Sequence, residues 1–255
     1  MLRSTGLCTI LLTVVASPLA AQWKITDPGI PRLKDGGPDL NAPAPRRPDG
    51  KPDLTGIWAA SPPKVRDVTL GLKAGEVSMT PWAQKTFDER KTGDLEAQDP
   101  DANCLPQGVP KINSIPPPFK IFQEPKTIVI LYEAMGQFRQ LFLDGRPLPK
   151  DANPQWYGYS VAKWDDDTLV VESSGFNGKA WLDQLGHPST EALHVTERFH
   201  RRDFGHMDVT STIEDPGAYT KPWTYAQPVT WQADTELIED VCENNRDVRH
   251  YKGNK

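Results

Sequence analysis

Histidines and carboxylates are concentrated in one short stretch of the chain, residues 181–206. Four of the five histidines fall within twenty residues of this stretch, and Asp and Glu side chains lie among them. Imidazole is the side chain that exchanges protons near neutral pH, and a neighbouring carboxylate can orient it or share its proton. We therefore predict that any proton-transfer chemistry resides here. The four histidines are His187, His194, His200 and His206.

Part of this stretch is predicted to form a β-hairpin, with strands over residues 191–202 and 206–214. Gly205 in the connecting loop is expected to adopt a left-handed conformation. Alternation of apolar and polar side chains sets the register, so that Glu197 faces Ser211 and His194 faces Glu214. One face is then polar, and the other is apolar except for Glu197 and Ser211. A shift by one residue would pair apolar with polar side chains throughout.

Two interpretations of this hairpin stay open, because small barrels can have apolar or polar interiors. If the apolar face points inward, Glu197 is a single carboxylate in an apolar cavity, where desolvation suits it to general acid or base catalysis. His194 and His200 then form surface ion pairs. If the polar face lines a wet lumen, His194, Arg198, His200 and His206 face the ligand. The first interpretation is favoured for Glu197.

The loop after residue 180 supplies a second candidate. Asp183 and His187 could form an oriented imidazole base, in which the carboxylate fixes the tautomer. Loops at the mouth of a barrel commonly carry catalytic groups. The alternative is a turn histidine that hydrogen-bonds to backbone. Together with Glu197, the loop predicts an acid/base set of Glu197, His187 and Asp183, in which His194 or Arg198 polarises a substrate oxygen.

No metal, cofactor or covalent nucleophile is predicted. The histidine spacings match no compact zinc signature. His194 and His200 share a strand face but lie about 20 Å apart at roughly 3.3 Å per residue. Ser160 stands in a sequence that imitates a nucleophile elbow, but a strand rather than a helix is expected to follow it. Neither a dinucleotide fingerprint nor a phosphate-binding loop is present.

Residues 1–21 are predicted to be a secretory signal peptide. Arg3 supplies the basic region, Leu7–Val15 the apolar run and Ser17–Ala21 the small-residue cleavage zone. The remaining chain is acidic, without a Lys/Arg-rich run or a further apolar stretch of membrane-spanning length. We therefore expect a periplasmic or secreted protein that binds neither nucleic acid nor an anionic membrane surface.

Two cysteines remain after the predicted cleavage, Cys104 and Cys242. In an oxidising compartment an even pair predicts a disulfide. The long loop that it closes would contribute at most about 5 kcal/mol on the chain-entropy model. Two free buried thiols or an incomplete metal site are the alternatives.

The remaining pattern predicts a mainly β protein. Residues 22–53 are rich in proline and read as an extended leader. A helix is predicted over Thr80–Arg90, where Thr80 caps the first turn. From Phe119 onward, short strands alternate with turns, including a hairpin at Asp144 and a final pair of strands in 222–239. We predict one domain over 54–255, an antiparallel lipocalin-like (calycin-type) barrel of about eight strands without internal repeats.

Longer motifs carry a resemblance to known proteins. Gly56-Ile57-Trp58 has the Gly-x-Trp form that opens lipocalin-like barrels, where the Trp plugs the closed end. Five motifs together resemble a large group of mostly uncharacterised secreted bacterial proteins: PDGKPDLTGIW (48–58), CLPQGVP (104–110), FLDGRPL (142–148), LHVTERF (193–199) and YTKPW (219–223). The resemblance spans nearly the whole chain after residue 21, and it implies compartment and fold more than activity.

Aromatic side chains supply candidate ligand contacts. Trp156, Tyr157 and Trp181 either pack in the core or form the wall of a ligand pocket. The leading hypothesis is a cofactor-independent acid/base enzyme, such as a lyase, isomerase or hydratase, acting on a small, partly apolar, cyclic or aromatic molecule. The alternatives are a non-catalytic carrier of a hydrophobic small molecule and a structural protein of the cell envelope. The sequence specifies neither the substrate nor the oligomeric state.

Overall fold

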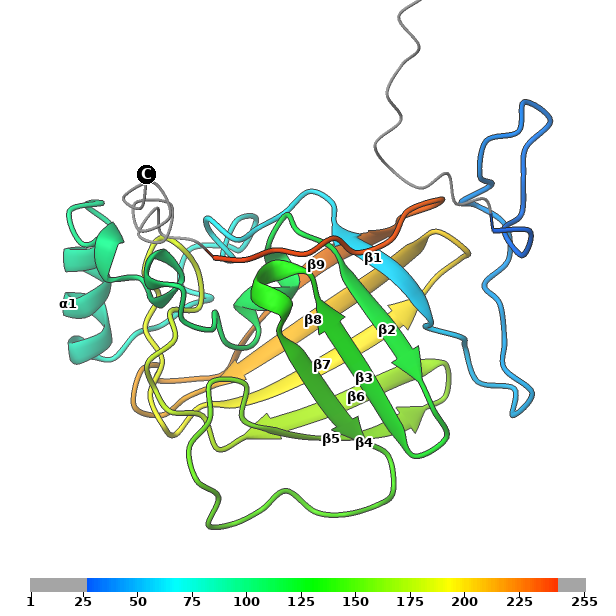
Figure 1. Ribbon diagram of the computed structural model, residues 1–255. Coiled ribbons are helices and arrows are strands. Elements are labelled where there is room, and N and C mark those ends of the chain that lie inside the picture. Colours follow the sequence, from blue (N-terminus) through cyan, green and yellow to red (C-terminus); the bar gives the residue numbers. More distant parts are fainter. Residues whose placement is uncertain (1–26, 243–255) are drawn as a thin grey trace, which may run out of the picture.

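Nine strands, hydrogen-bonded in chain order, close into a barrel in the computed structural model (Figure 1). The structure describes residues 27–242, so the predicted signal peptide lies outside the described residues. The expected mainly β barrel with one early helix is confirmed. The strands are β1 Gly56–Ala60, β2 Phe119–Gln123, β3 Thr127–Tyr132, β4 Phe138–Phe142, β5 Tyr159–Asp165, β6 Thr168–Ser174, β7 His194–Arg201, β8 His206–Glu214 and β9 Trp223–Trp231.

One junction of the barrel departs from the antiparallel pattern. β4 and β5 run parallel and pair at only two positions, Leu141 with Ser160 and Phe142 with Val161. The predicted hairpin at Asp144 is therefore wrong, and a long connection, residues 143–158, joins the two strands below the barrel in Figure 1. Asp144 instead forms a local ion pair with Arg146, and three prolines in the connection prevent a continued strand.

The predicted final pair of strands is also wrong. β9 alone forms in this region of the described chain, and it closes the barrel by pairing with both β8 and β1. Closure leaves no free edge for a further strand. The chain after β9 is instead held by side chains, including the ion pairs of Asp234 with Arg32 and of Glu236 with Lys120.

The β7–β8 hairpin has the predicted register. Glu197 pairs with Ser211 and His194 with Glu214, and the apolar face points inward. The left-handed conformation expected for Gly205 is wrong, because this residue has no positive φ. A Cβ at Gly205 would instead lie 2.4 Å from the Cβ of Leu40, so glycine is required by the close approach of the leader.

Trp58 fills the end of the barrel over which the leader lies. Its side chain is fully buried, and its indole Nε1 donates a hydrogen bond to the carbonyl of Leu54 at 3.0 Å. The guanidinium of Arg201 lies 4.9 Å from the centre of the ring and donates to backbone carbonyls of Asp53 and Phe204. The Gly-x-Trp motif therefore contributes the side chain that closes this end.

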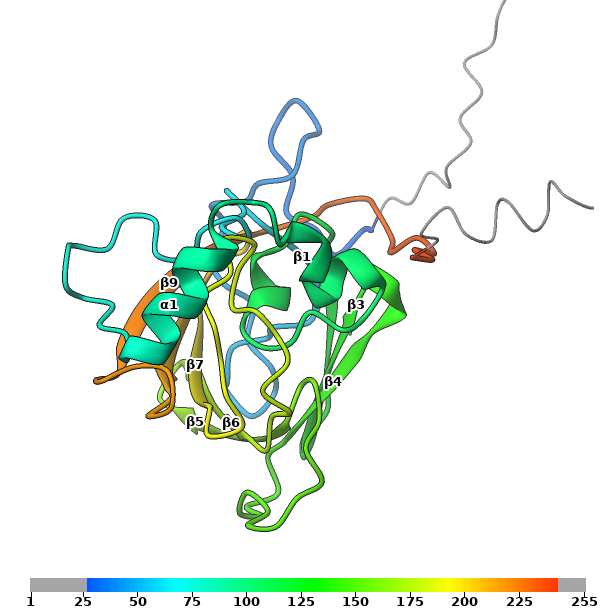
Figure 2. The same cartoon turned by 90° about the vertical axis from the view of Figure 1, so that its left-hand side faces the viewer.

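Helical segments and the loop 181–190 cover the opposite end (Figure 2). The helix α1 spans Pro81–Arg90, and Thr80 caps it as predicted by accepting a hydrogen bond from the amide of Ala83. Short 3-10 segments accompany it, of which η3, Lys111–Ser114, is buried at all four positions and acts as a plug. The others are η1 Glu96–Gln98, η2 Pro100–Asn103 and η4 Ala134–Gly136.

The predicted disulfide between Cys104 and Cys242 is confirmed, with a Cα–Cα distance of 5.5 Å. It joins the segment that leads into η3 to the stretch that follows β9. No helix among the described residues is long and apolar enough to span a membrane.

The leader contains a tandem repeat, contrary to expectation. PRLKDGGPDL (31–40) and PRRPDGKPDL (45–54) fold into the same turn, with isolated bridges between Arg32 and Pro38 and between Arg46 and Pro52. Each turn carries an arginine that forms an ion pair with an aspartate outside the leader. Arg32 pairs with Asp234 and Arg46 with Asp167, both at 2.5 Å. The repeat was missed because its spacing is shorter than that of the common repeat architectures.

The contact between Gly205 and the leader yields a prediction. Gly205→Ala should lower the free energy of unfolding by about 1–3 kcal/mol, the usual cost of overpacking. Protease cleavage within residues 31–54 should become faster. The second substitution Leu40→Gly removes the Cβ and Cδ2 that the alanine meets but keeps the Leu40 Cα, 2.9 Å from the added Cβ, so it should restore part of the loss. Equal urea unfolding curves for Gly205→Ala and the wild type would contradict the proposed contact.

Candidate functional site

The parallel junction leaves a cleft in the barrel wall. β4 and β5 pair only through the last two residues of β4 and through Ser160 and Val161 near the start of β5, so the chain before these positions is not paired with the other strand. Gln137–Gln140 and Gln155–Ser160 supply most of the lining, to which Pro106 and Phe142 also belong. Its volume is about 400 Å³, within the range of small-molecule sites.

Aromatic side chains form much of the wall of this cleft, together with three glutamines. Two of the three predicted ligand contacts, Trp156 and Tyr157, belong to the lining, whereas Trp181 does not. Trp181 is instead buried beneath Arg90, whose guanidinium lies 4.4 Å from its ring. The five aromatic residues of the lining are Phe138, Phe142, Trp156, Tyr157 and Tyr159.

Arg139 connects the cleft to the interior of the barrel. It lines the cleft, yet only 3% of its surface is exposed, and its Nη2 lies 2.7 Å from Oε2 of Glu197. The same Nη2 donates to the hydroxyls of Ser160 and Ser173, both at 3.3 Å. Burial opposes the charging of Arg139, but the Glu197 carboxylate raises its pKa above the usual value.

Two polar atoms in the cleft lining have no hydrogen-bond partner among the described residues. They are the Nε of Arg139 and the hydroxyl of Tyr157, and both atoms are buried. The backbone amide of Gln107 lies near the hydroxyl without forming a hydrogen bond of good geometry. Buried polar groups in proteins normally have partners, so a bound molecule is one explanation for such an exception.

Glu197 is buried as predicted, but it is not a lone carboxylate. Both of its oxygens are engaged, by the two Nη atoms of Arg139 and by Nδ2 of Asn113 at 2.5 Å. This carboxylate is already held by an ion pair and a hydrogen bond, so the premise of a lone acid in an apolar cavity is not met. Arg139 was not identified, although it occupies an inward position of the alternating strand 137–143.

The same network fixes the plug to the barrel. Asn113 of η3 bonds Glu197 on β7, and its Oδ1 accepts a hydrogen bond from the hydroxyl of Tyr132 on β3 at 2.9 Å. Ser114 and Tyr225 of β9 join their hydroxyls at 3.3 Å. Burial raises the pKa of Tyr132 to about 12.

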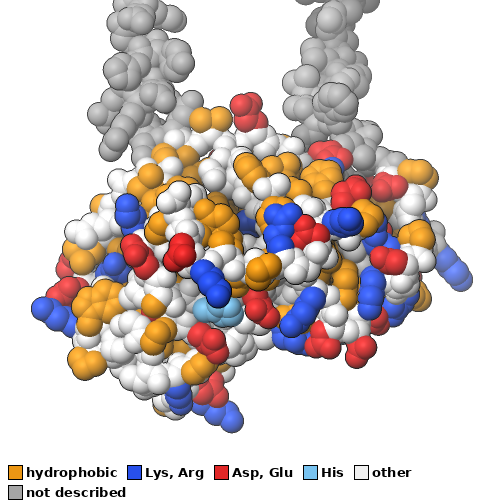
Figure 3. Space-filling model, turned by 90° about the horizontal axis from the view of Figure 1, so that it is seen from below, with side chains coloured by type: hydrophobic (Ala, Val, Ile, Leu, Met, Phe, Trp, Pro, Cys, Tyr) orange, Lys and Arg blue, Asp and Glu red, His pale blue; other side chains and the backbone are white. Residues whose placement is uncertain are grey.

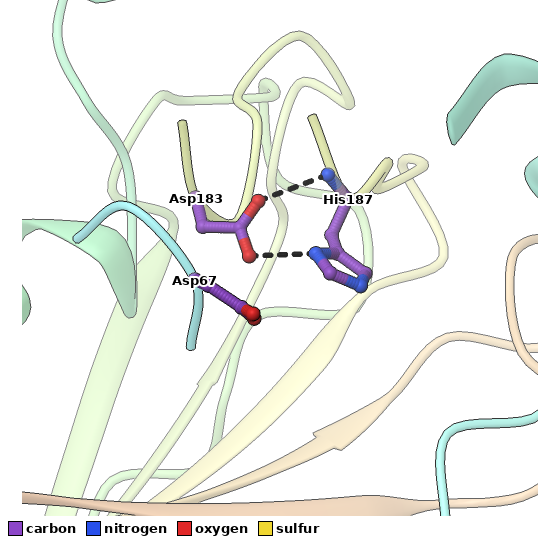
Figure 4. Close-up of side chains that lie close together, drawn as sticks. All are labelled: Asp67, Asp183 and His187. Carbon is purple, nitrogen blue, oxygen red and sulfur yellow. Dashed lines mark hydrogen bonds and ion pairs between the residues drawn. The ribbon is translucent and has the colours of Figure 1, made fainter. Parts of the chain in front are cut away.

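Asp183 and His187 form the predicted pair (Figure 4). Nδ1 of His187 lies 2.6 Å from Oδ2 of Asp183, whose Oδ1 accepts the backbone amides of Gly186 and His187. The imidazole is 3% exposed and packs on the ring of Phe87 in α1, with the ring centres 4.2 Å apart. The carboxylate therefore holds both the turn and the orientation of the ring.

Asp67 extends this pair in a way that the sequence analysis missed. One ligand atom from each of Asp67, Asp183 and His187 lies within 4.8 Å of the others, and this donor set suits a divalent cation (Figure 4). However, Asp183 also accepts the amide of Val68, and Asp67 accepts the amide and hydroxyl of Thr69. These hydrogen bonds explain why the three side chains lie together, because the two carboxylates stabilise neighbouring turns of the backbone.

The predicted catalytic set is not assembled in one place. No hydrogen bond among the described residues joins Glu197 to His187, whose partners belong to separate networks. His194 and Arg198 lie on the outer face of the hairpin, where they pair with Glu214 at 3.7 Å and Asp165 at 2.7 Å. Strand alternation places both on the side opposite Glu197, so neither can polarise an oxygen beside it.

Comparisons with known proteins leave the family undetermined. No family model matches the chain, and no curated protein matches it. A solved structure of a mutant of the fluorescent protein UnaG is similar over 72% of this chain and 97% of that chain, at 13% identity and a TM-score of 0.36. A likeness at this level carries no argument about function, and the resemblance to secreted bacterial proteins stays a prediction.

The buried ion pair yields a stability prediction. Arg139→Met leaves the Glu197 charge without its partner and should lower the free energy of unfolding by about 3–5 kcal/mol. The double variant Arg139→Met/Glu197→Leu removes both charges and should recover most of that loss. Urea unfolding of the two variants measures the difference. If both are equally unstable, the lost charge partner is not the cause.

Tyr132 yields a pH prediction. Its pKa is about 12 in the folded state, against about 10 for an unfolded tyrosine. The unfolded state therefore releases this proton first, and the stabilisation, complete below pH ~10, is lost as pH rises towards ~12. The free energy of unfolding of Tyr132→Phe should fall less steeply with pH over this interval than that of the wild type. The difference in slope should be up to about 1.4 kcal/mol per pH unit. Identical slopes for variant and wild type would exclude Tyr132 as a contributor.

Proposed function

We propose that this protein binds a small, partly apolar molecule in the β4–β5 cleft and acts as a carrier rather than an enzyme. The observation that carries the proposal is a cleft of about 400 Å³ with aromatic side chains in its walls and two buried polar atoms that have no partner within residues 27–242. Apolar walls with a few placed polar groups are the usual composition of a small-molecule site.

The network behind the cleft supports binding because it fixes Arg139 in advance. Glu197, Ser160 and Ser173 hold the guanidinium, so little side-chain entropy remains to be lost when a ligand arrives. The walls offer aromatic rings for stacking against a flat or cyclic molecule. Both features raise affinity without any chemical step.

The positions of the acid/base candidates favour a carrier over a lyase or isomerase. Glu197 is held by Arg139 and Asn113, and neither Asp183 nor His187 belongs to the cleft lining. A general base must reach the proton that it removes. None of the three acid/base candidates is therefore placed as a base in the described part of the cleft, which disfavours the enzyme hypothesis.

The proposal includes export to the periplasm or the medium. A disulfide between Cys104 and Cys242 is typical of an oxidising compartment. The apolar run before residue 21 and the resemblance to secreted bacterial proteins point the same way.

Coumarin, a flat neutral lactone, tests the proposal. Trp156→Ala and Phe138→Ala should each weaken coumarin binding about tenfold, equivalent to about 1.4 kcal/mol of lost contact. Fluorescence titration measures affinity, and chromatography after hours of incubation should recover coumarin unchanged. Phe122→Ala is the matched control, because this aromatic residue is 43% exposed but lies outside the cleft lining. Absence of binding, or equal losses in all three variants, would refute the site.

A further inference from the structure

The cleft offers a hydrogen-bond donor whose positive charge is already neutralised. We propose that, if the cleft binds a small molecule as above, it selects an uncharged ligand whose carbonyl or other acceptor oxygen bonds Arg139 and Tyr157, and that Glu197 excludes carboxylates. The assignment of a ligand class rests on the proposed function and goes beyond it.

The geometry of the Arg139 pair leaves one edge of the guanidinium available. Glu197 accepts from Nη1 at 3.3 Å and from Nη2 at 2.7 Å, which is an end-on arrangement. The two serine hydroxyls take up the remaining capacity of Nη2. The Nε–H therefore remains as a fixed, buried donor that forms no hydrogen bond of good geometry among the described residues, although the hydroxyl of Tyr132 lies near the same guanidinium.

The hydroxyl of Tyr157 is the second buried group of the cleft lining that has no partner among the described residues. Tyr157 stacks on Tyr132, with the ring centres 6.3 Å apart, so its position is fixed by the barrel. Burial raises its pKa, which keeps the hydroxyl protonated and able to donate. A carbonyl oxygen has two lone pairs and can accept from both groups.

Charge balance argues against an anionic ligand. Arg139 is the one charged residue of the described cleft lining, and Glu197 already neutralises it. A carboxylate at Nε would face Glu197 across a single guanidinium, in a site where little water screens the repulsion. Arg146 stacks on Phe142 at the margin, but Asp144 neutralises it in turn.

The distribution of charged side chains on the surface also gives no preference for an anionic ligand. On the face seen from below the barrel, basic and acidic side chains are interspersed rather than gathered into a field of one sign (Figure 3). Such a surface does not steer anions towards the cleft. A ligand without an acceptor would also be disfavoured, because the two buried groups would stay unpaired.

Three flat probes of similar size separate the effect of an acceptor oxygen from the effect of a negative charge: coumarin, naphthalene and coumarin-3-carboxylate. The wild type should bind coumarin about tenfold or more tightly than naphthalene, which lacks an acceptor, and than the carboxylate, which carries the disfavoured charge. Glu197→Gln leaves the Arg139 charge unbalanced and should shift the preference about tenfold towards the carboxylate. Glu214→Gln, the same change on the outer face of the hairpin, should leave the order unchanged.

A second variant keeps the test decisive if Glu197→Gln does not fold, as thermal unfolding would reveal. Tyr157→Phe should weaken coumarin about five- to tenfold and leave naphthalene unchanged. Equal affinities for the three probes, all lowered by Trp156→Ala, would overturn the selectivity and leave the proposed function intact. Tighter binding of the carboxylate by the wild type would also overturn it. If none of the probes binds, the proposed function and the ligand class fall together.

Discussion

The buried ion pair between Arg139 and Glu197 is the interaction on which the rest of the structure depends. A charge in the interior is tolerated only when it is paired and hydrogen-bonded, so β4, β7 and the plug η3 must meet at this point. The pair also explains why the carboxylate is unsuited to acid/base work. Its most important consequence lies beside the cleft, where the buried Nε–H of the guanidinium has no partner among the described residues.

A second constraint comes from the path of the chain. The parallel junction of β4 and β5 requires a long connection, and a parallel pair of only two positions cannot seal the wall. The cleft is therefore a product of topology, and the aromatic residues of the connection form its far wall. The ion pair and the junction together place a rigid donor at the base of an apolar opening.

Local patterns allowed several features to be predicted from the sequence. Alternation gave the register of the β7–β8 hairpin and the inward position of Glu197, and the capping residue Thr80 marked the start of α1. Trp156 and Tyr157 were identified as ligand contacts, and both line the cleft. These features depend on residues that are close together in the sequence, so local patterns are enough to predict them.

Features that depend on distant residues were not predicted. The partner of Glu197 comes from a strand 58 residues away, so its identity requires the order of strands in the closed barrel. Gly205 also depends on a distant residue. Glycine is needed there because Leu40 of the leader lies against it, and not because a turn requires a positive φ. The Asp144-Gly145 sequence favoured a hairpin, but the prolines that follow redirect the chain.

The Nε–H of Arg139 is the group that a ligand must meet if the cleft binds as proposed. Side-chain ¹H–¹⁵N NMR, with the signal assigned by its loss in Arg139→Lys, reports on this single proton. We expect this proton to exchange slowly with water in the free protein. When coumarin is added, its signal and the indole signal of Trp156 should both shift clearly. A signal that exchanges fast, or stays unmoved while coumarin shifts residues elsewhere, would contradict this expectation.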